Sequence, residues 1–250
     1  MSLKSHNILR NTEIMGSPFN SVITPSSLET IAGLIYKPTQ HPAWAQFAFA
    51  YLMNAGGYTL ALTEVASIID QTGNFDDIDT SSYGVDVNSE NADFNGLDTA
   101  QIQPDSGAVT VADCPTVKHL FVLFKAITQA DKWIIRTPTL SLKSHTSAGY
   151  LKFSHGDGVV ISVNVAANGL DLANPVLIEM YETATATVLR CYSHTGVRKI
   201  NTAGPALGAA DVTTLTFGNA EVDFAAAIGS VNKLDDDMAS QVRNYLLETF

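Results

Sequence analysis

Short runs of β-branched and aromatic residues fill the chain beyond residue 56, with Gly, Asn, Asp or Pro between them about every 8 to 12 residues. The clearest runs lie at 63–70, 119–127, 132–138, 158–166, 175–183, 186–193 and 221–231. No helical pattern interrupts them, so consecutive strands must pair antiparallel. The apolar face of such a sheet needs a second sheet to cover it. We therefore expect an all-β fold, an antiparallel sandwich with two stacked sheets.

Alternation within the runs indicates which side chains face the core. In 158–166, the side chains of Val160, Ser162 and Asn164 share the solvent face. The core face of this run carries Val159, Ile161, Val163 and Val165. In 175–183, apolar residues occur at both parities, which predicts a central strand.

The two ends of the chain depart from this pattern. Residues 1–22 are polar and show no period, so we interpret them as an N-terminal arm attached to one domain at 23–250. The segment 41–56 fits both helical spacing and strand alternation, and we slightly favour a helix there. The last residues predict an amphipathic C-terminal helix on the sandwich edge, with acidic residues 235–237 at its start and an apolar stripe of Leu234, Met238, Val242, Tyr245 and Leu246.

Charge and hydropathy exclude two classes of partner. The chain has 14 Lys and Arg against 25 Asp and Glu, a net charge of −11, and no basic run, so nucleic acid is not an expected partner. The longest apolar stretch, 43–53, is interrupted by Gln46 and too short for a bilayer, and no signal-like stretch opens the sequence. We expect no membrane insertion. Cys114 and Cys191 are expected to be buried thiols.

Several segments occur in an order found in one known family. They are SSLETIAGL from Ser26, DQTGN at 70–74 and DFNG at 93–96. In the second half, PVLIEMYETATATVLRCYSHTGV at 175–197 and DDDMASQVRNYLLETF at 235–250 follow. The chain resembles the concanavalin A-like (laminin G-like) jelly-roll domains, particularly those of tailed-phage virion proteins. His194-Thr195-Gly196 replaces the Asn-Gly turn usual in that family.

The resemblance draws attention to a catalytic pattern, because retaining glycosidases with this fold carry Glu-x-Asp-x-(x)-Glu on one strand. Glu221 and Asp223 match its first two positions. Ala225 and Ala226 stand where the third carboxylate belongs, so a leaving group would have no proton donor. We therefore expect no catalytic residue and no enzyme, and interpret 221–227 as a strand whose polar side faces water.

Metal and nucleophile patterns are equally incomplete. The loops 74–79 and 155–158 offer carboxylates, but neither has a known calcium-loop spacing, and we interpret both as solvated turns. The sequence contains no G-x-S-x-G elbow and no phosphate-binding glycine loop. We expect no metal and no cofactor.

A sugar site without metal needs an aromatic platform and polar groups at its edge. The candidates for glycan contact are Trp133, Tyr150, Tyr192 and Asp157. Trp133 opens a strand, and a core position is the competing interpretation.

The resemblance implies a function in binding or assembly. We predict a non-catalytic phage virion protein, made in the host cytoplasm: a capsid decoration, head-fibre or tail-associated module that displays a lectin-like domain for attachment to a cell-surface glycan. Its expected partners are other virion proteins, bound through the arm, and further copies of itself. A free carbohydrate-binding module or bacterial adhesin is the alternative, and a glycoside hydrolase is a third interpretation.

Overall fold

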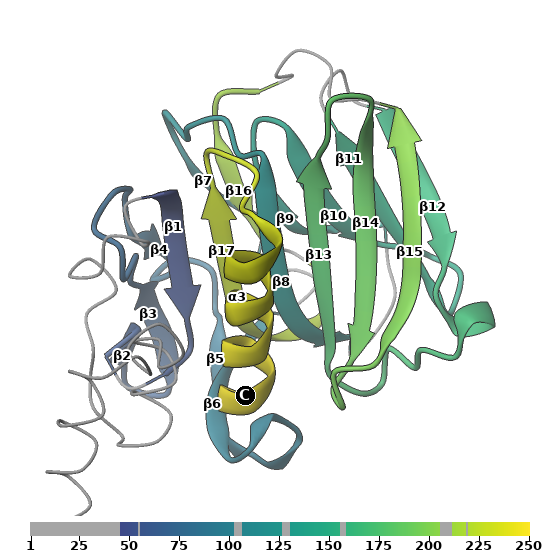
Figure 1. The fold of residues 1–250 in the computed structure, drawn as a ribbon. Coiled ribbons are helices and arrows are strands. Elements are labelled where there is room, and N and C mark those ends of the chain that lie inside the picture. Colours follow the sequence, from purple (N-terminus) through teal and green to yellow (C-terminus); the bar gives the residue numbers. More distant parts are fainter. Residues whose placement is uncertain are drawn as a thin grey trace, which may run out of the picture.

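The computed structural model describes residues 46–54, 56–102, 107–126, 131–155, 159–205, 212–218 and 220–250. Within these residues, two antiparallel sheets pack face to face, and one helix lies against the outer surface of the larger sheet (Figure 1). The predicted antiparallel β-sandwich with a C-terminal helix is confirmed. The arm at 1–22 and the segment that begins at Ser26 lie outside the described residues.

The larger sheet contains most of the strands. Its order is β15 (Arg198–Pro205), β14 (Ala186–Ser193), β13 (Val176–Glu182), β8 (His119–Ala126), β17 (Val222–Ser230), β6 (Leu97–Ile102), β5 (Asp86–Asn91), β3 (Glu64–Ile68) and β2 (Tyr58–Ala61). Off this path, β1 (Phe47–Leu52) pairs with β17, and β4 (Ile78–Asp79) pairs with β3.

The smaller sheet runs β12 (Val159–Asn164), β11 (Tyr150–His155), β10 (Leu140–Ser144), β9 (Trp133–Arg136), β16 (Leu215–Phe217) and β7 (Val109–Val111). Two short 3-10 turns, Ala92–Phe94 and Ala166–Asn168, connect strands. In β12, Ile161 and Val163 pack against the core while Ser162 is exposed, as the alternation predicted.

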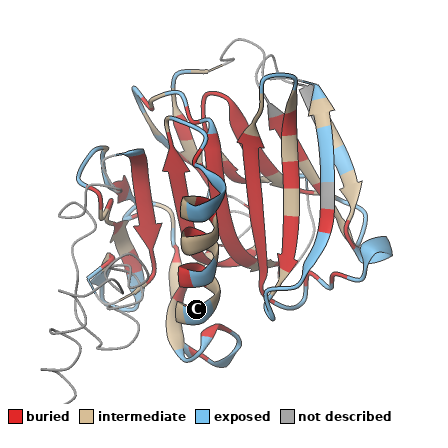
Figure 2. Cartoon of the chain, in the orientation of Figure 1, coloured by how far each residue is buried: buried red, intermediate tan, exposed pale blue. Residues whose placement is uncertain are grey.

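One apolar core fills the space between the sheets. Phe217 of the smaller sheet meets Phe224 of the larger one edge to face, with ring centroids 4.8 Å apart. The central strands β13, β8 and β17 are buried along almost their whole length, whereas the edge strand β15 is largely exposed (Figure 2). The prediction that 175–183 is a central strand is therefore confirmed.

Two local expectations were wrong. The segment 41–56 was expected to favour a helix, but its described part forms β1, whose six residues are all buried. Pairing with β17 satisfies the backbone of β1, and this tertiary contact outweighs the helical spacing. The polar side of 221–227 was expected to face water, but every residue of β17 is buried, because one face of this central strand meets the core and the C-terminal helix lies in front of the other.

Helix α3 (Asp236–Thr249) begins where the acidic residues predicted. The carboxylate of the N-cap residue Asp235 accepts a hydrogen bond from the Met238 amide at 2.7 Å. The buried face of the helix carries Ala239, Val242, Tyr245 and Leu246. This face lies over the outer side of β17, β8 and β13, so the expected position at the sandwich edge was wrong (Figure 1).

Of the segments that carried the family resemblance, 175–197 forms the β13–β14 hairpin and 235–250 forms α3, while 70–74 and 93–96 form turns. The Asp70 carboxylate accepts hydrogen bonds from the Ala50 amide at 2.7 Å and the Thr72 hydroxyl at 2.7 Å, which ties the 70–74 turn to β1. Gly196, with φ of 77°, closes the turn between β14 and β15, as expected for a substitute of Asn-Gly.

Candidate functional site

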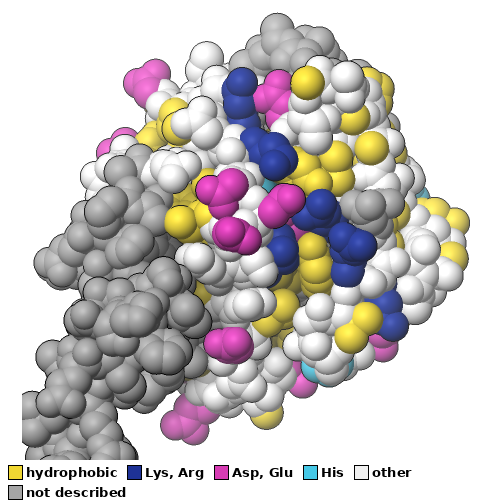
Figure 3. All heavy atoms as spheres, viewed as in Figure 1, with side chains coloured by type: hydrophobic (Ala, Val, Ile, Leu, Met, Phe, Trp, Pro, Cys, Tyr) yellow, Lys and Arg dark blue, Asp and Glu magenta, His cyan; other side chains and the backbone are white. Residues whose placement is uncertain are grey.

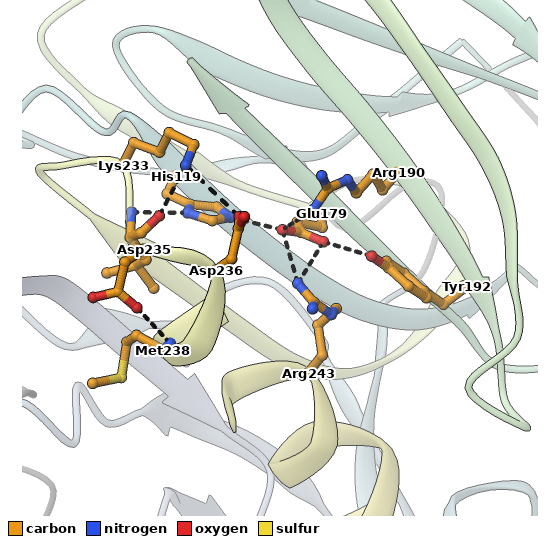
Figure 4. A network of polar contacts seen from close by, with 10 residues as sticks. His119, Glu179, Arg190, Tyr192, Lys233, Asp235, Asp236, Met238 and Arg243 are labelled. Atoms are coloured by element: carbon orange, nitrogen blue, oxygen red, sulfur yellow. Dashed lines mark hydrogen bonds and ion pairs between the residues drawn. The ribbon is translucent and has the colours of Figure 1, made fainter. Parts of the chain in front are cut away.

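A fully buried carboxylate lies between α3 and the outer face of the larger sheet. The Glu179 side chain of β13 accepts hydrogen bonds from Arg243 of α3 at 3.1 Å to each oxygen, and from the Tyr192 hydroxyl at 2.9 Å. His119 Nε2 lies 3.1 Å and Arg190 Nη1 3.5 Å from the same carboxylate (Figure 4). We call Glu179, His119, Arg190, Tyr192 and Arg243 the Glu179 network. It joins three strands to the helix.

The protonation states of the network follow from its contacts. The amide of Leu234 donates to His119 Nδ1 at 3.1 Å, so Nε2 carries the proton and donates to Glu179. Burial, the largest cause, lowers the pKa of His119, and the neutral imidazole is favoured. Burial alone would raise the pKa of Glu179, but hydrogen bonds and charges from His119, Arg243 and Tyr192 outweigh it and lower that pKa. An ionised Glu179 beside a neutral His119 results.

The Glu179 network leaves its carboxylate no access to a ligand. The Glu179 side chain is 0% exposed, and that of His119 is 1% exposed. Figure 3 shows Lys and Arg side chains gathered beside α3 over this sheet. Arg190 and Lys233 lie over the Tyr181 ring, at 4.8 and 5.3 Å from its centroid. We interpret the network as the contact that fixes α3 to the sheet.

A second polar cluster lies on the same face, at the opposite end of β8. Asp223 of β17 is only 4% exposed and lies opposite Lys125 of β8 in the strand register. Asn88 Nδ2 is 3.4 Å from the Asp223 carboxylate, and Lys125 pairs with Asp93 at 2.6 Å. Burial, the largest cause, raises the pKa of Asp223.

A small hollow opens beside this cluster. Its lining comes from the turn after β5, the sheet and the end of α3, and comprises Asp93, Asn95, Leu123, Pro175, His194, Leu247 and Phe250. Asp93 belongs to both the hollow and the cluster. The cluster therefore reaches the hollow through the Asp93 carboxylate, while Asp223 and Lys125 are not among the lining residues.

The third candidate is the solvent face of the smaller sheet. Trp133 of β9 lies opposite Lys143 of β10, which lies opposite Lys152 of β11. Lys143 Nζ lies 4.4 Å and the Arg136 guanidinium 5.1 Å from the centroid of the Trp133 ring. The alternate residues of these strands, such as Leu142 and Phe153, face the core. One face thus gathers an indole and three cations.

One carboxylate lies among these cations. Asp131 Oδ1 is 3.1 Å from Lys143 Nζ, and its Oδ2 is 3.0 Å from Lys152 Nζ. Hydrogen bonds from Lys152 and Lys143 lower the pKa of Asp131. The Asp131 side chain is 45% exposed, so this pair is in contact with solvent. We call Asp131, Lys143 and Lys152 the lysine clamp.

The four residues expected to contact a glycan separate in the structure. Trp133 and Tyr150 lie on the solvent face of the smaller sheet, with the His145 ring 5.4 Å from that of Tyr150. Tyr192 is buried in the Glu179 network. Asp157 lies outside the described residues.

Sequence reasoning missed the cations of the smaller sheet because it looked for a basic run. Arg136, Lys143 and Lys152 are far apart in sequence and meet only through strand pairing. A usable signal existed, since Lys143 and Lys152 each alternate with buried apolar residues in short strands. Pairing those two strands through the turn between them would have placed both lysines side by side.

Other chemistry is limited among the described residues. They contain no group of three or more His, Cys, Asp or Glu side chains placed to hold a metal ion. No helix within them is long and apolar enough to cross a membrane. Cys114 and Cys191 are buried free thiols, as predicted, and burial raises the pKa of each to about 12.

Comparison with known proteins gives likeness in fold only. No family model matches the sequence, and no curated protein matches it. A GH54 α-L-arabinofuranosidase is similar in structure, with a TM-score of 0.50, 10% identity, and 74% of this chain and 51% of that chain covered. The Trypanosoma rangeli sialidase in complex with sialic acid is similar with a TM-score of 0.52 and 8% identity, and the match covers 81% of this chain and 33% of that chain. Tailspike protein 2 of Escherichia coli O157:H7 bacteriophage CAB120 has a TM-score of 0.45, 15% identity, and coverage of 77% and 29%.

These likenesses correct one expectation. The chain was expected not to be an enzyme, but the solved structures that share its sandwich include glycoside hydrolases and sialidases. The fold therefore gives no ground for excluding catalysis. The chain spans about half the length of the arabinofuranosidases and a third of the sialidases, and at this identity the likeness establishes the fold alone.

Proposed function

We propose that this chain is a glycan-binding sandwich of the concanavalin A-like kind, with its binding surface on the solvent face of the smaller sheet. The observation that carries the proposal is the Trp133 ring flanked by Lys143 and Arg136 on that face. An aromatic ring beside polar groups on a rigid sheet is the usual composition of a sugar site. The Glu179 network is buried, and the Asp223 cluster has a buried acid beside a small hollow.

The face is rigid enough to position its side chains. Strands β10 and β11 pair in regular antiparallel register, β9 pairs with β10 with one register shift between Leu142 and Lys143, and the inward residues of these strands are anchored in the core. Contact with Lys143 and Arg136 holds the Trp133 ring in place, so a ligand meets a partly ordered surface and less entropy is lost on binding. Tyr150 extends the surface along β11.

The structural neighbours support a glycan ligand by analogy. The arabinofuranosidase was soaked with an arabinofuranoside, and the sialidase is in complex with sialic acid. Those sugars are ligands of those proteins. The shared sandwich makes a carbohydrate the first ligand class to test for this chain.

The direct test replaces Trp133. Trp133→Ala should weaken binding to a glycan identified on an array by at least tenfold, because the ring is the largest apolar group of the proposed surface. Trp133→Phe should retain part of the affinity. Tyr58→Ala, at an aromatic residue of β2 in the other sheet, serves as the control and should bind like the parent. Equal affinity in parent and Trp133→Ala would refute the proposed surface.

The proposed setting is a phage particle. Support comes from the order of the 70–74, 93–96 and 235–250 segments, which resembles that of tailed-phage virion proteins. Residues 1–22 would bind other virion proteins, and many copies would strengthen attachment to a cell-surface glycan. Co-sedimentation with purified particles is the expected result. A chain found only free, with saturable glycan binding as a monomer, would favour the carbohydrate-binding module or adhesin.

Glycan hydrolysis is a second candidate, favoured by the raised pKa of the buried Asp223. A carboxyl group that holds its proton can act as a general acid, and the Asp93 carboxylate lies within electrostatic range of it. If the chain hydrolyses p-nitrophenyl α-L-arabinofuranoside, Asp223→Asn should reduce the rate at least 100-fold. Glu182→Gln, at a surface ion pair with Lys118, is the control. No release of nitrophenol by the parent would count against this candidate for that substrate.

A further inference from the structure

The lysine clamp holds its carboxylate in a particular geometry. Each oxygen of Asp131 faces a different lysine, and the lysines come from adjacent strands that the sheet holds in register. The Lys143 and Lys152 side chains are 20% and 21% exposed, so their stems are packed while the ammonium groups face outward. The sheet thereby fixes two ammonium donors, one for each oxygen of a carboxylate, at the protein surface.

The charge on this face opposes that of the whole chain. The protein carries a net charge of −11, yet Lys143 and Lys152 pair with Asp131 on this face and Arg136 lies over the neighbouring Trp133 ring. A local excess of positive charge on an acidic protein attracts anions to one place and repels them elsewhere. The complementary ligand therefore carries negative charge.

Asp131 is held less tightly than a buried carboxylate. Its side chain is 45% exposed, and exposed ion pairs contribute little to stability. An incoming carboxylate can therefore replace it on the two lysines at small cost, since the same two ion pairs are formed again. Lys143 also lies over Trp133, so an anionic group held by the clamp lies next to the indole.

We propose that the lysine clamp binds the carboxylate of an acidic glycan, such as a uronic or sialic acid residue, and that Asp131 occupies the clamp until the ligand replaces it. The inference rests on the proposed glycan-binding function and names its ligand class. It assigns Lys143 and Lys152 to the ligand carboxylate and Trp133 to the adjoining sugar ring. Asp131 becomes a competitor that limits affinity.

The test uses the full chain and matched pairs of oligosaccharides. The probes are oligogalacturonate, hyaluronan oligosaccharide and oligosialic acid, each beside its carboxyl-reduced neutral form, with dextran sulfate as a general polyanion. Binding is measured by calorimetry at low and at physiological salt. At least one acidic probe should bind, and its reduced form should bind at least tenfold more weakly. Raising the salt concentration should weaken binding of the acidic probe and leave binding of the reduced form unchanged.

Variants separate the clamp from general electrostatics. Lys143→Gln and Lys152→Gln should each lower the affinity for the acidic probe at least tenfold. Lys118→Gln removes the same charge elsewhere on the protein and should change that affinity less than twofold. Asp131→Asn should strengthen binding of the acidic probe severalfold. Asp237→Asn, an equal change of charge on α3, should not.

The outcomes distinguish this inference from the proposed function. Equal binding of acidic and reduced probes, with loss in Trp133→Ala, would overturn the clamp and leave glycan binding intact. Weaker acidic binding in Asp131→Asn would show that Asp131 supports the site, and would overturn its role as competitor. Dextran sulfate bound as tightly as the best acidic probe would reduce the site to a polyanion surface. No binding of any acidic or neutral probe would overturn both proposals.

Discussion

The two outer faces of the sandwich both hold a carboxylate among cations and aromatic rings, but they treat it differently. On the larger sheet, α3 covers Glu179, and two arginines, a tyrosine and a histidine surround it at 0% exposure. On the smaller sheet, two lysines hold Asp131, which remains 45% exposed. The first carboxylate cannot leave without breaking the packing of the helix, whereas the ion pairs of the second are in contact with solvent.

The two carboxylates differ in what the loss of their ion pairs would cost. A buried ion that loses its partners is strongly destabilising, because the remaining charges stay out of water. An exposed ion pair that opens is solvated at once. Similar residue types therefore fix an element on one face of the molecule and leave a carboxylate in contact with solvent on the other. Burial, more than composition, decides which.

The largest expected effect comes from removing the Glu179 charge. Glu179→Gln should lower the free energy of unfolding by about 3–5 kcal/mol, because Arg243 and Arg190 would remain partly buried without their counter-charge. Asp131→Asn should change it by less than about 1 kcal/mol. Urea denaturation of both variants measures the difference. Similar losses in the two variants would break the contrast between the faces.

The second effect is a dependence on pH. The folded-state pKa of His119 and that of Glu179 both lie below their ordinary values, so the unfolded chain takes up protons first as the pH falls. The stability that these groups contribute is present above their unfolded pKa values, about 6.5 for His and 4.3 for Glu, and is lost as the pH falls towards the folded values. Each group can cost up to about 1.4 kcal/mol per pH unit in its window.

His119→Asn isolates the histidine part of this dependence. The variant should be less stable at pH 7, and its free energy of unfolding should vary less with pH than that of the parent between about 6.5 and 5. His145→Asn, at a partly exposed histidine in the turn between β10 and β11, is the control. An unchanged slope in His119→Asn would show that His119 does not titrate with folding.

The smallest effect concerns Asp223 and has the opposite sign. Its pKa is raised in the folded protein, so the stability that it contributes falls as the pH rises from its unfolded value, about 3.9, towards the folded one. Asp223→Asn should therefore be as stable as the parent at pH 7, or more stable by about 1 kcal/mol. Chemical denaturation at pH 4 and pH 7 tests this, and a clear loss of stability at pH 7 would contradict it.

The sequence predicted those parts of the fold that depend on local period. Alternation in 158–166 and 175–183 identified inward residues and a central strand, and the acidic start identified α3. Strands such as β5 (DVNSEN) were missed, because their polar composition carries no apolar alternation and pairing with neighbours holds them in place. The ambiguity of FAFAYL was resolved only by its contact with β17.

The candidate site was less predictable than the fold, because cross-strand neighbours create it. Trp133 was selected from the sequence as an aromatic residue, but its cationic neighbours come from positions in other strands or further along its own. Tyr192 met the same sequence criterion and is buried under α3. The type of residue could be read from the sequence, whereas its exposure and partners required the sheet register.

The most direct test of the exposed face is a titration followed by NMR, because the chain contains only two tryptophans, Trp44 and Trp133. With oligogalacturonate or another acidic oligosaccharide that binds, the Trp133 indole NH signal, assigned with Trp133→Phe, should shift in proportion to occupancy. The side-chain signals of Arg243 should stay in place. Binding that leaves the Trp133 indole unshifted while residues around α3 respond would contradict the account.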